Sequence, residues 1–259
     1  MIVSIFLIAN GELEVVKASL TGSIIGNVLL VLGMSFLVGG WNRKEQRFSR
    51  ATAGLYTGSL VIAVIALLMP ALFALSPNAT HAHTEAVSIG VAVVLIAMYA
   101  LSMLFSMKTH RSLFRADFER PDKSSTTGAV VKLVLATVAV AAMSEILVAS
   151  LSQAVTELGI SRLFVGLIVV PIIGNAAEHV EIAIGSSTQI AIFVAPVLVF
   201  VSLIAGHPMN FVFSAPEIAA VTAATAVLSF IALDGRANWF EGAELIATYV
   251  ILAISFYFL

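Results

Sequence analysis

The chain has 259 residues, of which 60% are hydrophobic and 11% are charged, and its formal net charge is -2. An ordinary soluble domain has roughly 25% charged residues, and the mean hydropathy here is +1.06, so the composition predicts a polytopic membrane protein. The absence of cysteine excludes disulfides, thiol catalysis and cysteine-ligated metal.

Apolar stretches of about 20 residues are long enough to cross a bilayer core of about 30 Å. The apolar N-terminal residues 1–9 lack a basic n-region, so we interpret them as the end of a helix and not as a signal peptide. In chain order the stretches predict spans at 16–39, 51–75, 86–107, 128–152, 214–233 and 241–259.

Basic residues predict the topology. Nine of the thirteen Lys and Arg lie in loops 40–50 and 108–127, and none lies in loop 76–85. The positive-inside rule places the two basic loops in the cytoplasm and loop 76–85 outside. Loop 206–213 then lies outside and the loop with Arg236 lies inside only if the preceding stretch, 163–205, crosses the membrane twice.

That stretch, 163–205, has no polar turn. As one helix its 43 residues would run about 65 Å, twice the bilayer core, so it must be broken. Broken helices at this depth line cavities and hold ion sites in transporters. The candidate breakers are Pro171, Gly174, Gly185 and Pro196.

A weak internal sequence similarity predicts two related halves. Leu-Thr-Gly-Ser at 20–23 aligns with Ala-Ile-Gly-Ser at 183–186, an offset of 163 residues, and the same offset maps the span at 51 onto the span at 214. We therefore expect a first transmembrane repeat at 1–107, a cytoplasmic linker at 108–127 and a second repeat at 128–259.

The strongest motif is Gly-Asn-Ala-Ala-Glu-His at 174–179. It offers an amide oxygen, backbone carbonyls near a glycine, a carboxylate and an imidazole, and Ca²⁺ prefers oxygen ligands with at least one anion. A carboxylate desolvated at this depth favours its neutral form, so Glu178 could hold a proton when no cation is bound. The alternative is a packing glycine beside a satisfied buried Glu178–His179 pair.

Neutral polar residues accompany the motif. Ser186 and Gln189 share a helical face, as do Ser23 and Asn27 in the first half. They could line a cation path, or they could form interhelical hydrogen bonds as a packing device.

Glu145 lies two thirds of the way through the span 128–152, where a proton-relay or gating carboxylate is favoured over a snorkelling one. Glu217 and Glu244 lie at helix ends, so we expect water to reach them.

His81 and His83 are expected to be solvated surface and not a transition-metal site. The sequence has no H-E-x-x-H, G-x-S-x-G or Walker A motif. We therefore expect no enzyme activity, and transport powered by an ion gradient.

Val-Val-Pro-Ile-Ile-Gly-Asn-Ala-Ala-Glu-His at 169–179 resembles the second-repeat signature of the calcium/proton exchanger (CAX) branch of the calcium/cation antiporters. This resemblance implies an all-α, polytopic transmembrane helix bundle with two inverted repeats of about five helices each. It implies an antiporter that exchanges Ca²⁺, or a related divalent cation, for H⁺ by alternating access and contributes to calcium homeostasis. Further segments resemble the family in the same order: 19–27, 29–33, 108–111, 143–148, 185–191 and 238–242.

The resemblance also implies roles for individual residues. Glu178 would alternately bind Ca²⁺ and H⁺. Proton coupling would involve Glu178, His179 and Glu145, and the metal site would comprise Glu178, Asn175, Gly174, Ser186, Gln189, Ser23 and Asn27. Expected partners are Ca²⁺, H⁺ and the lipid bilayer, with no cofactor and no nucleic acid, and a homo-oligomer is compatible with the pattern.

Two departures from the family pattern keep an alternative open. The first-repeat Gly-Asn-x-x-Glu motif should lie upstream of Ile2, so the first repeat is expected to be incomplete at its N-terminus. Val180 directly follows His179, where the family has a further helix and a basic turn. The alternative is a truncated, non-transporting, cation-binding membrane fragment or subunit.

We expect a prokaryotic cell (inner) membrane, with a vacuolar or other organelle membrane as the alternative location. Coupling to Na⁺ is disfavoured because the imidazole of His179 titrates near neutrality.

Overall fold

The structure is a computed structural model of the whole chain. It describes residues 1–114 and 180–259, except 42 and 233, together with 161–169 and the positions 128, 131, 134, 135, 137, 138, 141, 142, 146 and 159. The statements below concern these residues.

The first half consists of helices joined by short turns. One of them is a continuous helix from Leu13 to Gly40, in which a π-helical segment separates two α-helical parts. The elements in chain order are α1 (Ile2–Ala9), α2 (Leu13–Ile25), η1 (Gly26–Val31), α3 (Leu32–Gly40), β1 (Gln46–Arg47), α4 (Arg50–Ala74), α5 (His81–Leu104), η2 (Phe105–Thr109) and η3 (Arg111–Phe114).

The second half has the same plan. A short helix leads into a π-helical segment, and a long helix, again interrupted by a π-helical segment, is followed by two further helices. The elements are α7 (Arg162–Phe164), η4 (Val165–Val169), α9 (Val180–Gln189), η5 (Ile190–Val194), α10 (Ala195–Ile204), α11 (Ala215–Ile231), β2 (Arg236–Ala237) and α12 (Trp239–Tyr257).

Four predicted spans are confirmed, 16–39, 51–75, 86–107 and 241–259, and one further helix lies in the stretch 163–205. The predicted span 128–152 lies mostly outside the described residues. Five helices are long and apolar enough to cross a membrane, at Leu13–Gly40, Arg50–Ala74, His81–Thr109, Ile184–Ile204 and Trp239–Tyr257. The apolar helix α11 is shorter, at 17 residues. Gly185, a candidate breaker, lies inside α9, and η5 lies between it and Pro196.

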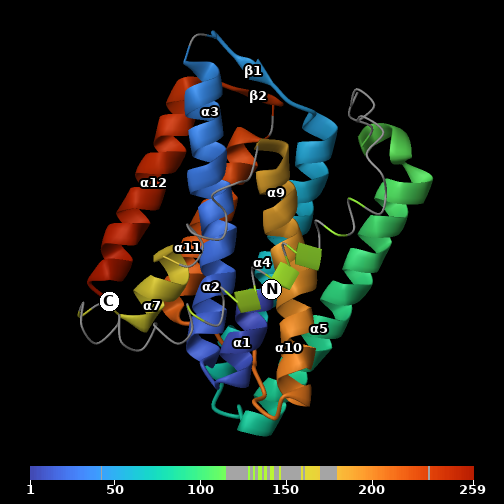
Figure 1. Cartoon of the computed structure of the whole chain (residues 1–259), viewed down its shortest axis with the longest axis vertical. Helices are drawn as coiled ribbons and strands as arrows, with labels where there is room; N and C mark the ends of the chain where they lie inside the picture. The colour runs from blue at the N-terminus through green and yellow to red at the C-terminus, as the bar shows by residue number, and fades with distance from the viewer. Residues whose placement is uncertain are drawn as a thin grey trace.

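The offset of 163 residues seen in the sequence also relates the two halves of the structure. Applied to η1, it gives 189–194, and the second half has its π-helical segment η5 at 190–194. The helix contacts are reciprocal, because α3 packs on α12 as α10 packs on α5, and α2 packs on α11 as α9 packs on α4. In Figure 1, α2–α3 and α9–α10 run in opposite directions, as inverted repeats require.

The loops group at two ends of the bundle in the way the charge pattern predicts. β1 pairs with β2 in antiparallel fashion, which places the basic loop before α4 beside the loop with Arg236 (Figure 1). At the opposite end the backbone N–H of Phe211 donates to Ser88 Oγ near the start of α5, at 3.1 Å. Following the positive-inside prediction, we call the end with β1 and β2 the inner end and the other the outer end.

The continuous helix α2–η1–α3 lies at the centre of the core. Its best 18-residue window is 56% buried, whereas the corresponding window of α5 is 17% buried. Large apolar side chains on α5, such as Val94 and Leu101, are exposed, as expected for a helix that faces lipid. Side chains of α2 and η1 are therefore in contact with both halves of the molecule.

Candidate functional site

Two of the predicted site residues meet at the contact between the halves. Asn27 lies in η1, and its Nδ2 donates to the Oγ of Ser186 on α9 at 2.5 Å. The two positions are 159 residues apart in sequence, so the hydrogen bond joins the first repeat directly to the second.

The other end of the Asn27 amide is a free acceptor in the described part of the chain. Asn27 is 0% exposed, and its Oδ1 has no hydrogen-bond partner among the described residues. Leaving a buried acceptor unsatisfied costs about 1–3 kcal/mol, so such a group points to a ligand. A neutral amide oxygen is one of the ligand types that Ca²⁺ binds.

Small residues bring the helix before the Gly-Asn-Ala-Ala-Glu-His motif onto α2. A Cβ added to Gly22 would overlap the backbone of Leu167 in η4, and a Cβ added to Gly166 would lie 2.5 Å from the Cβ of Ala18. This contact holds η4, which ends at Val169, against the helix that continues into the segment with Asn27.

Each of the three π-helical segments in or beside the two long helices adjoins predicted site residues. η1 contains Asn27, η5 begins directly after Gln189, and η4 ends shortly before Gly174. π-Helical turns are rare and frequently mark functional sites because they break the regular backbone hydrogen-bond pattern. The sequence predicts a break only within 163–205, where it favours glycine or proline as the cause, and it gives no sign of the π-helical segment η1.

The remaining predicted residues divide into two groups. Ser23 and Ser186 are half-buried, and Gln189 is exposed at the start of η5. The other five lie outside the described residues: Gly174, Asn175, Glu178, His179 and Glu145.

The structure corrects the expectation for Glu217. It is 3% exposed, so it is a buried carboxylate and not a solvated one. Its hydrogen bonds to Ser214 and Thr21 hold it between α11 and α2. The one hint in the sequence is a Ser–x–x–Glu capping pattern at 214–217, which places a carboxylate at a helix N-terminus without indicating that a second helix covers it.

One simpler expectation holds: His81 and His83 are exposed at the start of α5, where His81 lies 3.9 Å from Glu85. At the inner end, Gly235 has φ +73°, and the backbone N–H of Arg236 donates to Asp234 Oδ1 at 3.0 Å, which forms the turn before α12.

Comparison with known proteins identifies the family. The model of the sodium/calcium exchanger protein family matches residues 1–108, 128–183 and 180–258. The chain belongs to this family. The resemblance to calcium/proton exchangers is confirmed, and with its five candidate spans the chain is an integral membrane protein. The second half matches in two overlapping pieces that meet at 180–183, next to the His179–Val180 junction.

Individual relatives agree with this assignment. The chain is 40% identical over 281 residues to the Ca²⁺/H⁺ antiporter ChaA of Bacillus subtilis, covering 100% of this chain and 80% of that one. It is 33% identical over 281 residues to the vacuolar calcium ion transporter of Schizosaccharomyces pombe, covering 100% and 68%. The solved structure of native YfkE superposes with a TM-score of 0.86 at 39% identity, covering 100% of this chain and 79% of that one.

Proposed function

We propose that this protein is a secondary active antiporter that exchanges Ca²⁺, or a related divalent cation, for H⁺ across a membrane by alternating access, and so contributes to calcium homeostasis. The observation that carries the proposal is the buried Asn27 amide. It is held by Ser186 at the contact between two inverted repeats, and its oxygen is left without a partner among the described residues. Ion sites of repeat-built transporters lie at such contacts.

We propose that the cation is bound by Glu178 with Asn175, Gly174, Ser186, Gln189, Ser23 and Asn27. Glu178 supplies the anionic oxygen, and the hydroxyl and amide groups supply neutral oxygens that compensate for lost water. Packing of Gly22 against Leu167 supports this set, because it fixes the approach to the motif beside α2.

Proton coupling follows from competition at one carboxylate. Protonation of Glu178 removes the anionic ligand and releases the cation, and binding of the cation expels the proton. His179 tunes this step because an imidazole titrates near neutral pH, and Glu145 relays the proton or gates its path. The working partners are then Ca²⁺, H⁺ and the bilayer, with no resident cofactor required.

The repeats would be residues 1–107 and 128–259, with 108–127 as a cytoplasmic linker. The bacterial relative favours a prokaryotic cell membrane, and the vacuolar relative fits the alternative of an organelle membrane. The matches cover the whole chain and most of each relative, which favours a working transporter over a non-transporting fragment.

Glu178→Gln tests the proposal. In proteoliposomes, Ca²⁺ uptake driven by a pH gradient should fall to the background of empty vesicles, because the amide can neither carry the charge nor exchange the proton. Glu244→Gln is the matched control, since Glu244 is exposed on α12 and its removal should leave uptake unchanged. Proton-driven uptake that persists in Glu178→Gln would disprove the assignment, and a Na⁺ gradient applied alone should drive no uptake.

A further inference from the structure

A stripe of polar contacts runs along the face of the long first-half helix that meets the second half. Its members are spaced three or four residues apart, as residues on one helical face are. From the outer end inward they are the Lys17 ammonium, the Thr21 hydroxyl, the Ile24 carbonyl and the Asn27 amide. The two deeper contacts, of Ile24 with Ser187 and of Asn27 with Ser186, are neutral, whereas the two outer contacts involve charges.

Lys17 ties α2 to the segment that precedes α11. Its Nζ donates to Asn210 Oδ1 at 2.7 Å and to the backbone carbonyl of Val212 at 3.0 Å. Asn210 Oδ1 also accepts the backbone N–H of Val212 at 3.2 Å. The ammonium is therefore held by two acceptors of one short segment, 193 and 195 residues away in sequence.

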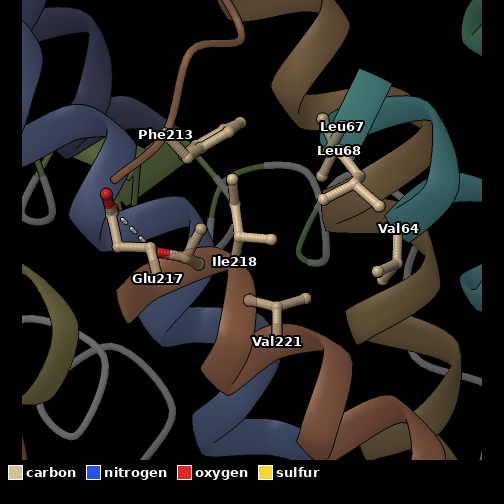
Figure 2. Close-up of a pocket in the computed structure, with 8 residues that line it drawn as sticks. Val64, Leu67, Leu68, Phe213, Glu217, Ile218 and Val221 are labelled. Carbon is tan, nitrogen blue, oxygen red and sulfur yellow. Dashed lines mark hydrogen bonds between the residues drawn. The ribbon is translucent and has the colours of Figure 1, made fainter. Parts of the chain in front are cut away.

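Glu217 ties the start of α11 to α2. Its Oε2 accepts the backbone N–H of Ser214 at 2.9 Å and the Ser214 hydroxyl at 2.7 Å, and its Oε1 lies 3.1 Å from Thr21 Oγ1. In Figure 2 the carboxylate points away from the apolar side chains of α4 and α11. Each of these three hydrogen bonds therefore involves either the cap of its own helix or the first repeat.

The segment between α10 and α11 closes the outer end. Phe211 is 0% exposed, and the backbone N–H groups of Met209 and Phe211 donate to Ser202 Oγ at 2.8 Å and Ser88 Oγ at 3.1 Å. The cavity next to Glu217 measures about 20 Å³, which is room for about one water molecule. Water therefore has little space between α2 and α11 at this level.

We propose that Glu217 and Lys17 are positioning residues of the exchange reaction. They hold the outer part of α2 against the second repeat, so that Asn27 faces Ser186. Thr21 lies six residues before Asn27, about 9 Å along the helix, so a shift of α2 at Thr21 displaces the Asn27 amide. This inference rests on the proposed function, because the position of Asn27 matters for exchange only if Asn27 binds the cation.

Two substitutions of similar length separate this role from that of a proton carrier. The amide of Glu217→Gln accepts from Ser214 through its oxygen and donates to Thr21 through its nitrogen, so the contacts survive without a titratable group. The thioether of Glu217→Met fills similar space but makes neither contact. A positioning role tolerates glutamine and not methionine, whereas a proton carrier tolerates neither.

Exchange kinetics in proteoliposomes give the first readout. Glu217→Met should raise the KM for Ca²⁺ about tenfold, the change that 1.4 kcal/mol produces, with a maximal rate close to that of the wild type. Glu217→Gln should restore the KM to within about threefold of the wild type, which is less than 0.7 kcal/mol. Failure of the glutamine variant to exchange, or an unchanged KM in the methionine variant, would overturn the proposal. If Glu217→Met does not fold, Thr21→Val removes the same contact and should raise the KM likewise.

Thiol labelling gives a readout that does not depend on transport. The chain has no cysteine, so Val221→Cys introduces a single thiol into the cavity wall, at a position that is 4% exposed. A membrane-impermeant methanethiosulfonate added from outside should modify this thiol about tenfold faster when Lys17→Met or Glu217→Met is also present. The reason is that a loss of 1.4 kcal/mol of contact energy between α2 and the second repeat raises tenfold the fraction of molecules in which they have separated. Equal labelling rates would refute the positioning role of Lys17 and Glu217, even in a protein that exchanges no Ca²⁺. Faster labelling without exchange would refute the proposed function alone.

Discussion

The two ends of the interface between the repeats are held together by different physical means. At the outer end, charged groups of one repeat are bonded to the other, the half-buried Lys17 to Asn210 and the buried Glu217 to Thr21. At the inner end the charged contact between the repeats, Glu45 to Arg236, is exposed. The outer end therefore depends on keeping every polar group paired, and the inner end must obtain its stability from something else.

Close packing of backbones provides that stability. A Cβ added to Gly33 would lie 3.0 Å from the carbonyl oxygen of Gly242, and one added to Gly40 would lie 2.8 Å from the backbone nitrogen of Trp239. These contacts let α3 and α12 approach along their length, with β1 and β2 paired above them (Figure 1). Trp41 and Trp239 meet edge to face at 6.3 Å, and as exposed aromatic residues they suit a membrane interface.

Lys17→Met should have the largest effect on stability. It leaves Asn210 Oδ1 without its strongest donor and Glu217 without the nearby positive charge that attracts it. A hydrogen bond to a charged group contributes about 1.5–3 kcal/mol, and Lys17 makes two. Thermal unfolding in detergent should show a clearly lowered midpoint.

The double variant Lys17→Met/Glu217→Gln is the matched comparison. It removes both charges while the glutamine keeps its contacts with Ser214 and Thr21, so part of the lost stability should return. If the double variant is less stable than Lys17→Met by the full effect of a second independent lesion, the two groups do not act as one network.

Gly242→Ala should have the next largest effect, at the inner end. Its Cβ would lie 2.7 Å from the carbonyl oxygen of Gly33 and would also overlap the backbone at Leu37, so α3 and α12 must move apart. Overpacking of this kind costs about 1–3 kcal/mol. Thermal unfolding is again the measurement.

Gly90→Ala on α5 is the control for this substitution. Nothing lies within 4 Å of its added Cβ, and alanine favours a helix over glycine by about 1 kcal/mol. Equal losses in the two variants would show that the approach of α3 to α12 does not determine the result.

The sequence predicted the spans well because their apolar character is continuous, but it misplaced boundaries where polar residues extend a helix. The structure begins α2 at Leu13, before Glu14 and Lys17, and α5 at His81. The hydroxyl of Thr80 accepts the backbone N–H of His83 and starts α5 five residues before the predicted span. A count of apolar residues does not register such a cap.

Only part of the site was predicted, because the sequence shows polar residues within apolar spans but not the contacts between distant segments. Asn27 and Ser186 stood out as polar residues inside apolar spans, and the structure brings them together. Glu217 was expected to be solvated at a helix end, and nothing in the sequence singled out Lys17. Their burial depends on contacts between residues almost 200 positions apart in the chain, 193 for Lys17 and 196 for Glu217. No local pattern carries that information.

The smallest effect is expected from Glu45→Gln, which removes the exposed charge contact at the inner end. The Arg47 side chain, which donates to Glu45 at 2.7 Å, and the nearby Arg236 hold the pKa of Glu45 below its ordinary value. A lowered pKa means that the stabilisation is present above the ordinary carboxyl pKa of about 4.3 and is lost as the pH falls through the lowered value. Exposed ion pairs contribute little because water and salt screen them. The unfolding midpoint of Glu45→Gln should therefore lie barely below that of the wild type at neutral pH and low salt, and should coincide with it below the lowered pKa. A loss at neutral pH as large as that of Gly242→Ala would mean that the inner end, like the outer one, is held by its charges.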